Sequence, residues 1–94
     1  MDELLLSKTR LGIVAELLPS QWITFSELQR STQTSNGNLG AHLAKLVDAG
    51  YVQEEKRFVN RRPETRYILT ERGRDAFVVH VREMQALLER GKVS

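Results

Sequence analysis

The chain has 94 residues, of which 40% are hydrophobic and 28% charged, and its formal net charge is +2. Its length and ordinary composition predict one globular domain over residues 1–94. No apolar run approaches the ~20 residues of a membrane span, Asp2 and Glu3 argue against a secretory signal peptide, and the absence of cysteine excludes disulfides and thiolate zinc sites. We therefore expect a cytoplasmic protein.

The first expected element is a helix over residues 4–18. Leu4, Leu11 and Leu18 recur at helical spacing. Other leucine, isoleucine and valine residues in this segment make the apolar surface wider than one stripe. The helix should therefore contact apolar neighbours on more than one side. Pro19 ends it.

A short β-prone stretch at 22–24 leads into a second helix. Thr24 and Glu27 fit a capping box, in which each side chain bonds the other residue's backbone. The helix is expected to run to about Ser31, with Phe25 and Leu28 facing inward. A polar turn follows.

The third expected helix runs from about Ser35 to Ala49 and ends at Gly50, the residue type that favours a helix C-terminus. Leu39, Leu43, Leu46 and Val47 share one face. The opposite face carries Asn38, Ala41, Lys45 and Asp48, with His42 on its flank.

Two β-prone stretches, 51–59 and 66–70, flank a turn predicted over Asn60–Thr65, which indicates an antiparallel hairpin. Residues 56–74 hold seven of the fourteen basic residues against two acidic ones, a local net charge of +5. Such a cluster is expected of a phosphate-backbone binder. It is equally typical of a solvated surface, and charge alone does not decide between them.

The last expected helix covers residues 71–90. Thr70 can cap it, Glu71 complements the positive end of its dipole, and Gly91 should close it. A heptad-like apolar seam runs along it through Phe77, Val81, Met84 and Leu88.

Five stretches of this sequence resemble the winged-helix transcriptional regulators, most closely the small MarR-like and ArsR-like proteins. They are WITFSEL at 22–28, NGNLGAHLAKL at 36–46, AGYV at 49–52, KRFVNRRPETRY at 56–67 and LTERG at 69–73. Together they span roughly residues 8–88.

The resemblance implies an α+β fold, mainly α: a winged helix-turn-helix with a three-helix core, a wing sheet of two to three strands and a long C-terminal dimerisation helix. The helix-turn-helix would cover about 24–49 and the wing about 51–70. The terminal helices, 4–18 and 71–90, would dimerise. The function implied is sequence-specific binding of double-stranded DNA by a homodimer, more often to repress by occlusion than to activate.

A recognition helix presents short polar groups to the major groove. On that basis Asn38 suits adenine, Ala41 a thymine methyl, and Lys45 guanine or a phosphate. His42 would contact DNA less directly. The helix N-terminus favours a phosphate, and Thr34, Ser35 and Asn36 lie there. The alternative is that these polar side chains face solvent and contact no DNA.

The wing tip carries Arg61 and Arg62, which can enter the minor groove or pair with phosphates. Lys56, Arg57 and Arg66 would hold the backbone on either side. The alternative is a hairpin whose charges protect its edges.

The terminal helices carry more apolar surface than one small core needs, which indicates an interface. We expect a two-fold dimer that presents two recognition helices to a pseudo-palindromic site. Its contact residues would be Leu5, Leu6, Ile13, Leu17, Phe77, Val81, Met84 and Leu88.

Gly37 and Gly40 are unusual inside a helix. Close approach to DNA and close packing against the preceding helix both explain such glycines. Close packing is the interpretation preferred for Gly40, and neither is preferred for Gly37. His42 and His80 are a poor metal set, so neither metal nor cofactor is expected. A small-molecule effector could bind between the terminal helices and the DNA-binding half, but no set of residues identifies such a site.

Neither a cysteine nucleophile nor a glycine-rich phosphate loop is present, so an enzyme is not expected. The alternative to DNA binding is a winged-helix module that binds protein or RNA, because fold does not fix function.

Overall fold

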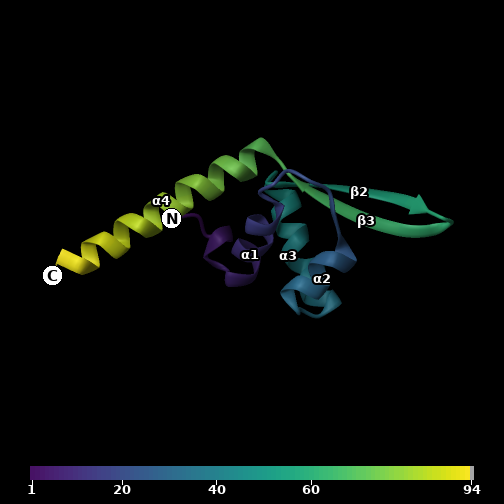
Figure 1. Ribbon diagram of the computed structural model, residues 1–94, viewed down its shortest axis with the longest axis horizontal. Coiled ribbons are helices and arrows are strands. Elements are labelled where there is room, and N and C mark those ends of the chain that lie inside the picture. The colour runs from purple at the N-terminus through teal and green to yellow at the C-terminus, as the bar shows by residue number, and fades with distance from the viewer. Residues whose placement is uncertain (94) are drawn as a thin grey trace.

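Three helices packed on a small antiparallel sheet form the body of the molecule, with a hairpin projecting at one end and a long helix at the other (Figure 1). The computed structural model describes residues 1–93. The elements are η1 (Leu4–Leu6), α1 (Lys8–Leu17), β1 (Ile23–Thr24), α2 (Phe25–Thr32), α3 (Asn36–Asp48), β2 (Val52–Val59), β3 (Arg62–Leu69) and α4 (Glu71–Val93).

The N-terminal segment is not the single helix expected over 4–18. It forms a 3₁₀ turn, η1, and a separate helix, α1. Ser7 lies between them with an extended backbone (φ −70°, ψ 123°), and its hydroxyl accepts a hydrogen bond from the Arg10 N–H. A serine that caps a new helix in this way interrupts the preceding one, which apolar periodicity does not reveal.

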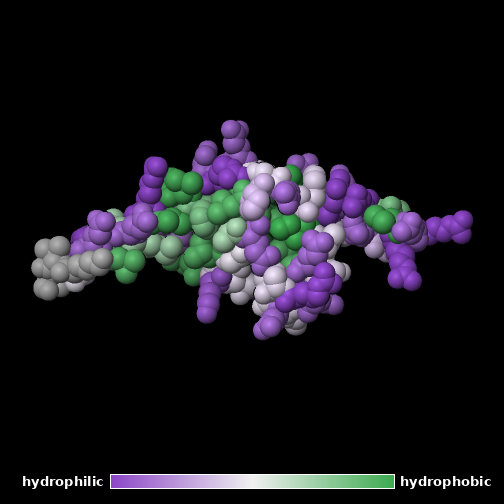
Figure 2. All heavy atoms as spheres, viewed as in Figure 1, coloured by the Kyte–Doolittle hydropathy of each residue, from purple (hydrophilic) through white to green (hydrophobic). Residues whose placement is uncertain are grey.

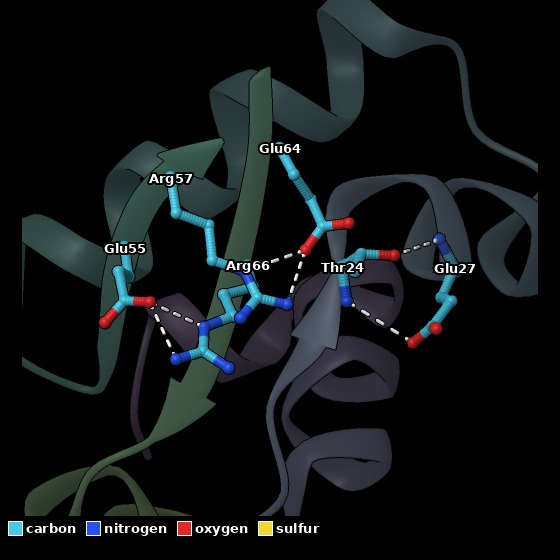
Figure 3. Close-up of polar contacts among 6 residues, drawn as sticks. All are labelled: Thr24, Glu27, Glu55, Arg57, Glu64 and Arg66. Atoms are coloured by element: carbon cyan, nitrogen blue, oxygen red, sulfur yellow. Dashed lines mark hydrogen bonds and ion pairs between the residues drawn. The ribbon is translucent and has the colours of Figure 1, made fainter. Parts of the chain in front are cut away.

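The capping box at the start of α2 is confirmed (Figure 3). Thr24 Oγ1 accepts from the Glu27 N–H at 3.1 Å, and Glu27 Oε2 accepts from the Thr24 N–H at 3.3 Å. The helix ends at Thr32, and Gln33 then takes a left-handed conformation (φ 53°) that turns the chain sharply. Ser35 caps α3 through the Asn38 N–H, so α2 and α3 are joined by a tight polar turn, as expected.

The sheet has the order β1-β3-β2, with both strand pairs antiparallel. The turn of the hairpin is shorter than the Asn60–Thr65 expected, because β3 begins at Arg62. Asn60 (φ 51°) and Arg61 (φ 66°) both adopt positive φ, which is the geometry of a two-residue type I′ turn. We call this β2–β3 hairpin, residues 52–69, the wing.

The core lies between the helices and the inner end of the sheet, and all its members are almost fully buried. They are Leu5, Ile13, Val14, Leu17, Leu28, Leu39, Leu43, Leu46, Val52, Tyr67 and Leu69. The inward faces expected for α2 and α3 are thereby confirmed, with Phe25 and Val47 partly buried against this cluster.

Helix α4 starts as expected and ends later than expected. Thr70 Oγ1 accepts from the Gly73 N–H at 3.0 Å, so Thr70 caps the helix. Gly91 was expected to close it, yet the helix continues to Val93, because Gly91 does not take the left-handed conformation of a C-terminal cap. Among the described residues, no helix has the length and apolar character to cross a membrane.

Candidate nucleic-acid interface

The solvent face of α3 is set by the residues that anchor its other side. Leu39, Leu43 and Leu46 are buried, and side chains on the far side of a helix must then face solvent. Asn38, Ala41, Lys45 and Asp48 are indeed exposed, as expected. Around Ala41 this face carries short or polar side chains, and its one cation is Lys45.

The N-terminus of α3 is also open. Ser35 and Asn36 are exposed, and Thr34 is half-buried with its carbonyl accepting from Gln29 Nε2 at 3.2 Å. Unpaired N–H groups of a first helical turn, together with the helix dipole, favour an anion. Thr34, Ser35 and Asn36, which are expected to contact a phosphate, therefore lie at a helix end that favours an anion.

His42 is half-buried beside α1 and does not lie on the exposed face. Its Nδ1 lies 3.0 Å from Nη1 of Arg10. The pKa of His42 is lowered from 6.5, first by desolvation and then by the positive charges of Arg10 and Lys45. The neutral ring is thus favoured in the folded protein.

The two glycines of α3 have no packing role in this chain. A Cβ added at Gly37 or Gly40 would meet no atom within 4 Å. The preferred interpretation of Gly40, close packing against the preceding helix, is therefore wrong. Close packing does require glycine at Gly73, where a Cβ would overlap the carbonyl oxygen of Tyr51.

Two of the five wing cations expected to contact DNA are engaged within the chain (Figure 3). Arg57 donates to Glu64 Oε1 through Nε at 3.0 Å and Nη2 at 2.8 Å. Arg66 donates to Glu55 Oε1 at 2.7 Å, and its guanidinium lies over the Trp22 ring at 4.2 Å from the centroid. The charges of Arg57 and Arg66 are therefore largely neutralised.

The other three wing cations are Lys56, Arg61 and Arg62. All are exposed, and none forms an ion pair with another described residue. Figure 2 shows hydrophilic side chains extending from the end of the wing. The uncompensated positive charge of the wing is therefore at its tip and at Lys56.

Sequence reasoning missed Phe58, whose side chain is 78% exposed on the wing. Directly opposed residues of an antiparallel pair share a face, so Phe58 lies on the face of Lys56, Thr65 and Pro63. Strand alternation alone would have placed Phe58 beside Lys56. An exposed phenyl ring among unpaired cations is suited to contact with sugars or bases.

The expected dimer residues fall into two groups. Leu5, Ile13 and Leu17 are fully buried in the core of one chain, so the structure corrects their assignment to an interface. Leu6 and Leu88 are 60% and 68% exposed, Phe77 packs partly against the core, and Val81 and Met84 are partly exposed.

Among the described residues, no group of three or more histidine and carboxylate side chains is placed to hold a metal ion. His80 is buried in α4, with Nδ1 lacking a hydrogen-bond partner in the described part of the chain.

The arrangement of helices, turn and hairpin matches known proteins. A family model described as a winged-helix DNA-binding domain matches residues 9–88. An uncharacterised protein of Methanocaldococcus jannaschii is 32% identical over 81 residues, which are 86% of this chain and 88% of that protein.

Solved structures agree. A transcriptional regulator homologue from Pyrococcus horikoshii superposes with a TM-score of 0.86 at 28% identity, over 94% of this chain and 87% of that chain. A MarR protein from Peptoclostridium difficile shares the fold, with a TM-score of 0.70 at 20% identity, over 93% of this chain and 56% of that chain.

The chain therefore belongs to the winged-helix DNA-binding domain family. The expected winged-helix fold is confirmed, and the family is one of DNA-binding regulators rather than enzymes. The MarR-like and ArsR-like parts of the resemblance stay predictions.

Proposed function

We propose that this protein binds duplex DNA sequence-specifically and regulates transcription as a homodimer, by occluding the sites it covers. The observation that carries the proposal is the division of the wing's charge. Arg57 and Arg66 are neutralised by Glu64 and Glu55, whereas Lys56, Arg61 and Arg62 keep their charge exposed. Cations without internal partners are available to phosphates and to the minor groove.

In this proposal α3 enters the major groove. Asn38, Ala41 and Lys45 face the base edges, while the open N-terminus at Thr34, Ser35 and Asn36 receives a phosphate. Because Gly37 and Gly40 have only open space beside them, the helix backbone can approach the DNA closely. Arg57 and Arg66 shape the wing rather than contact phosphates directly.

Two chains would pair through α4, with residues 24–49 as the helix-turn-helix of each. The apolar stripe that packs on the body near Phe77 continues outward through Met84, Leu87 and Leu88. Figure 2 shows hydrophobic surface following α4 away from the body. Leu6 adds to the exposed apolar area near the N-terminus. A second copy of the chain is the partner that two-fold DNA recognition requires.

The test is fluorescence anisotropy with duplexes enriched from a random DNA pool, measured across a range of salt concentrations. The logarithm of the affinity falls linearly with the logarithm of the salt concentration. Each lost phosphate contact reduces the steepness of this fall by about 0.9. The double variant Arg61→Ala/Arg62→Ala should bind more weakly, and its slope should fall by up to about twice that amount.

The matched control is Arg57→Ala/Glu64→Ala, which also removes two wing side chains but deletes an internally neutral pair. It should bind nearly as the unaltered protein does. Equal loss in both variants would contradict the assignment of the tip. Enrichment of RNA rather than duplex DNA from matched pools would favour the alternative function.

A further inference from the structure

Arg10 connects three segments at the edge of the interface. It lies in the first turn of α1, and its Nε donates to the carbonyl oxygen of Leu4 at 2.7 Å. Its Nη1 lies 3.0 Å from Nδ1 of His42 on α3. One guanidinium thus joins η1, α1 and the recognition helix.

The contact determines which ring nitrogen of His42 carries the proton. A guanidinium has donors and no acceptor. His42 Nδ1 must therefore accept, and a neutral ring then carries its hydrogen on Nε2. The lowered pKa of His42 agrees with a neutral ring.

The second nitrogen is available for binding. Nε2 of His42 has no hydrogen-bond partner among the described residues. On α3, His42 lies one turn from Asn38 and from Lys45, which are both exposed. The N–H of Nε2 therefore belongs to the flank of the proposed DNA-contacting face.

We propose that Arg10 is a positioning residue that holds His42 as an Nε2–H donor, so that this flank of α3 recognises a hydrogen-bond acceptor on DNA. The acceptor is a purine N7, guanine O6, thymine O4 or a phosphate oxygen. This role rests on the proposed function. It makes His42 selective against positions that offer only a donor, such as the amino group of cytosine.

The first experiment needs no DNA. Long-range ¹H–¹⁵N correlation spectra of the histidine rings at neutral pH should show His42 with Nδ1 unprotonated and Nε2 protonated. In Arg10→Met the ring should become a mixture of tautomers. Arg82→Met, which removes an exposed cation from α4, should leave the His42 spectrum unchanged. A wild-type ring that is already a mixture, or carries its proton on Nδ1, would overturn the proposal.

The second experiment is a double-mutant cycle on the enriched duplex. His42→Phe should weaken binding about three- to tenfold, as expected for one hydrogen bond. His42→Gln, whose side-chain amide can donate from a similar place, should retain most of the affinity. Arg10→Met should weaken binding in the wild-type background but have little further effect beside His42→Phe. Additive losses would refute the coupling.

Modified DNA distinguishes the two sources of the acceptor. Replacing a purine by its 7-deaza analogue should abolish the effect of His42→Phe if N7 is the partner. A methylphosphonate should do so if the partner is a phosphate oxygen. If the unaltered protein binds no duplex, the proposed function fails and DNA recognition by His42 fails with it. The spectra still decide whether Arg10 fixes the tautomer.

Discussion

At the scale of single residues, Gly73 shows how closely the start of α4 approaches the body. A Cβ there would overlap the carbonyl oxygen of Tyr51 and lie 2.7 Å from Leu69 Cδ1. Gly73→Ala should lower the free energy of unfolding by about 1–3 kcal/mol, the usual cost of overpacking. Urea denaturation measures this change.

The control for Gly73 is Gly12, which is also helical but where a Cβ would meet nothing within 4 Å. Gly12→Ala should raise the free energy of unfolding by up to about 1 kcal/mol, because alanine is the better helix former. A loss of stability in both variants would point to helix geometry in general rather than to the contact with Tyr51.

His42 should make stability depend on pH. Its folded-state pKa is lowered from 6.5 by desolvation and by Arg10 and Lys45. The unfolded chain therefore binds the proton first, and stability falls as the pH falls from 6.5 through the folded pKa. His42→Gln should lose this component, as unfolding measured at about pH 8 and about pH 5.5 would show. An NMR titration giving a ring pKa above 6.5 would reverse the predicted sign.

At the scale of elements, the helices were the most predictable because their signals are local. The box formed by Thr24 and Glu27, and the leucine spacing of α3, lie within one or two turns of chain. Ser7 is the exception. Serine favours helix caps but also occurs within helices, so Ser7 alone does not mark the break between η1 and α1.

The wing was predicted in place but not in register. No glycine marks the turn, so the left-handed conformations of Asn60 and Arg61 were not visible in the sequence. With the two-residue turn, Arg57 faces Glu64 and Arg66 faces Glu55. A longer turn breaks both pairings, which is why all the wing arginines were expected to be available for DNA.

Arg61 occupies a position that a hairpin turn normally gives to glycine. At φ 66° a residue with a side chain is strained, so Arg61 makes the protein less stable than glycine would. The presence of arginine at this position therefore needs a reason other than stability. Arg61→Gly should stabilise the protein by about 1 kcal/mol in thermal or urea unfolding. It should also weaken DNA binding, with the salt slope falling by about 0.9. A variant that gains stability and keeps its full affinity would separate the tip from DNA binding.

Phe58 contributes to the same element without charge. Phe58→Ala should reduce affinity for duplex DNA by about 1 kcal/mol while leaving the salt slope unchanged. Because the ring is 78% exposed, folding stability should change little. Val79→Ala, which truncates a 53% exposed apolar residue of α4 away from the wing, is the control and should bind normally. An unchanged affinity in Phe58→Ala would assign that face of the wing to solvent.

At the scale of the whole molecule, the sequence predicts an apolar interface on both terminal helices, whereas the structure places part of that apolar set inside the core of one chain. Helical periodicity treats Ile13 and Leu88 alike. Only the tertiary arrangement shows that Ile13 lies inside the body, whereas Leu88 lies on a helix that extends beyond it. The 59 Å length of the molecule against 26 Å across reflects the projecting wing and α4 (Figure 1).

Pairing through the outer part of α4 should therefore be sensitive to a charge at its exposed stripe. Leu87→Glu/Leu88→Glu should convert a dimer into a monomer in light scattering coupled to size exclusion, because two carboxylates would have to be buried in each copy. Folding should be preserved, since Leu87 is 51% and Leu88 68% exposed in one chain. Arg82→Glu is the control. It places a carboxylate at an exposed residue that lies about 120° around α4 from Leu88 and about 140° from Leu87, and it should leave the dimer intact.

Loss of pairing should also reach the DNA. Two recognition helices held by one interface bind a two-fold site with the affinity gained from linkage, whereas a separated chain binds each half alone. The monomeric variant should thus bind a full site no more tightly than a half-site, while the unaltered protein should prefer the full site strongly. If the double glutamate variant stays dimeric, the interface lies elsewhere and Leu6 with the N-terminal segment becomes the surface to alter next.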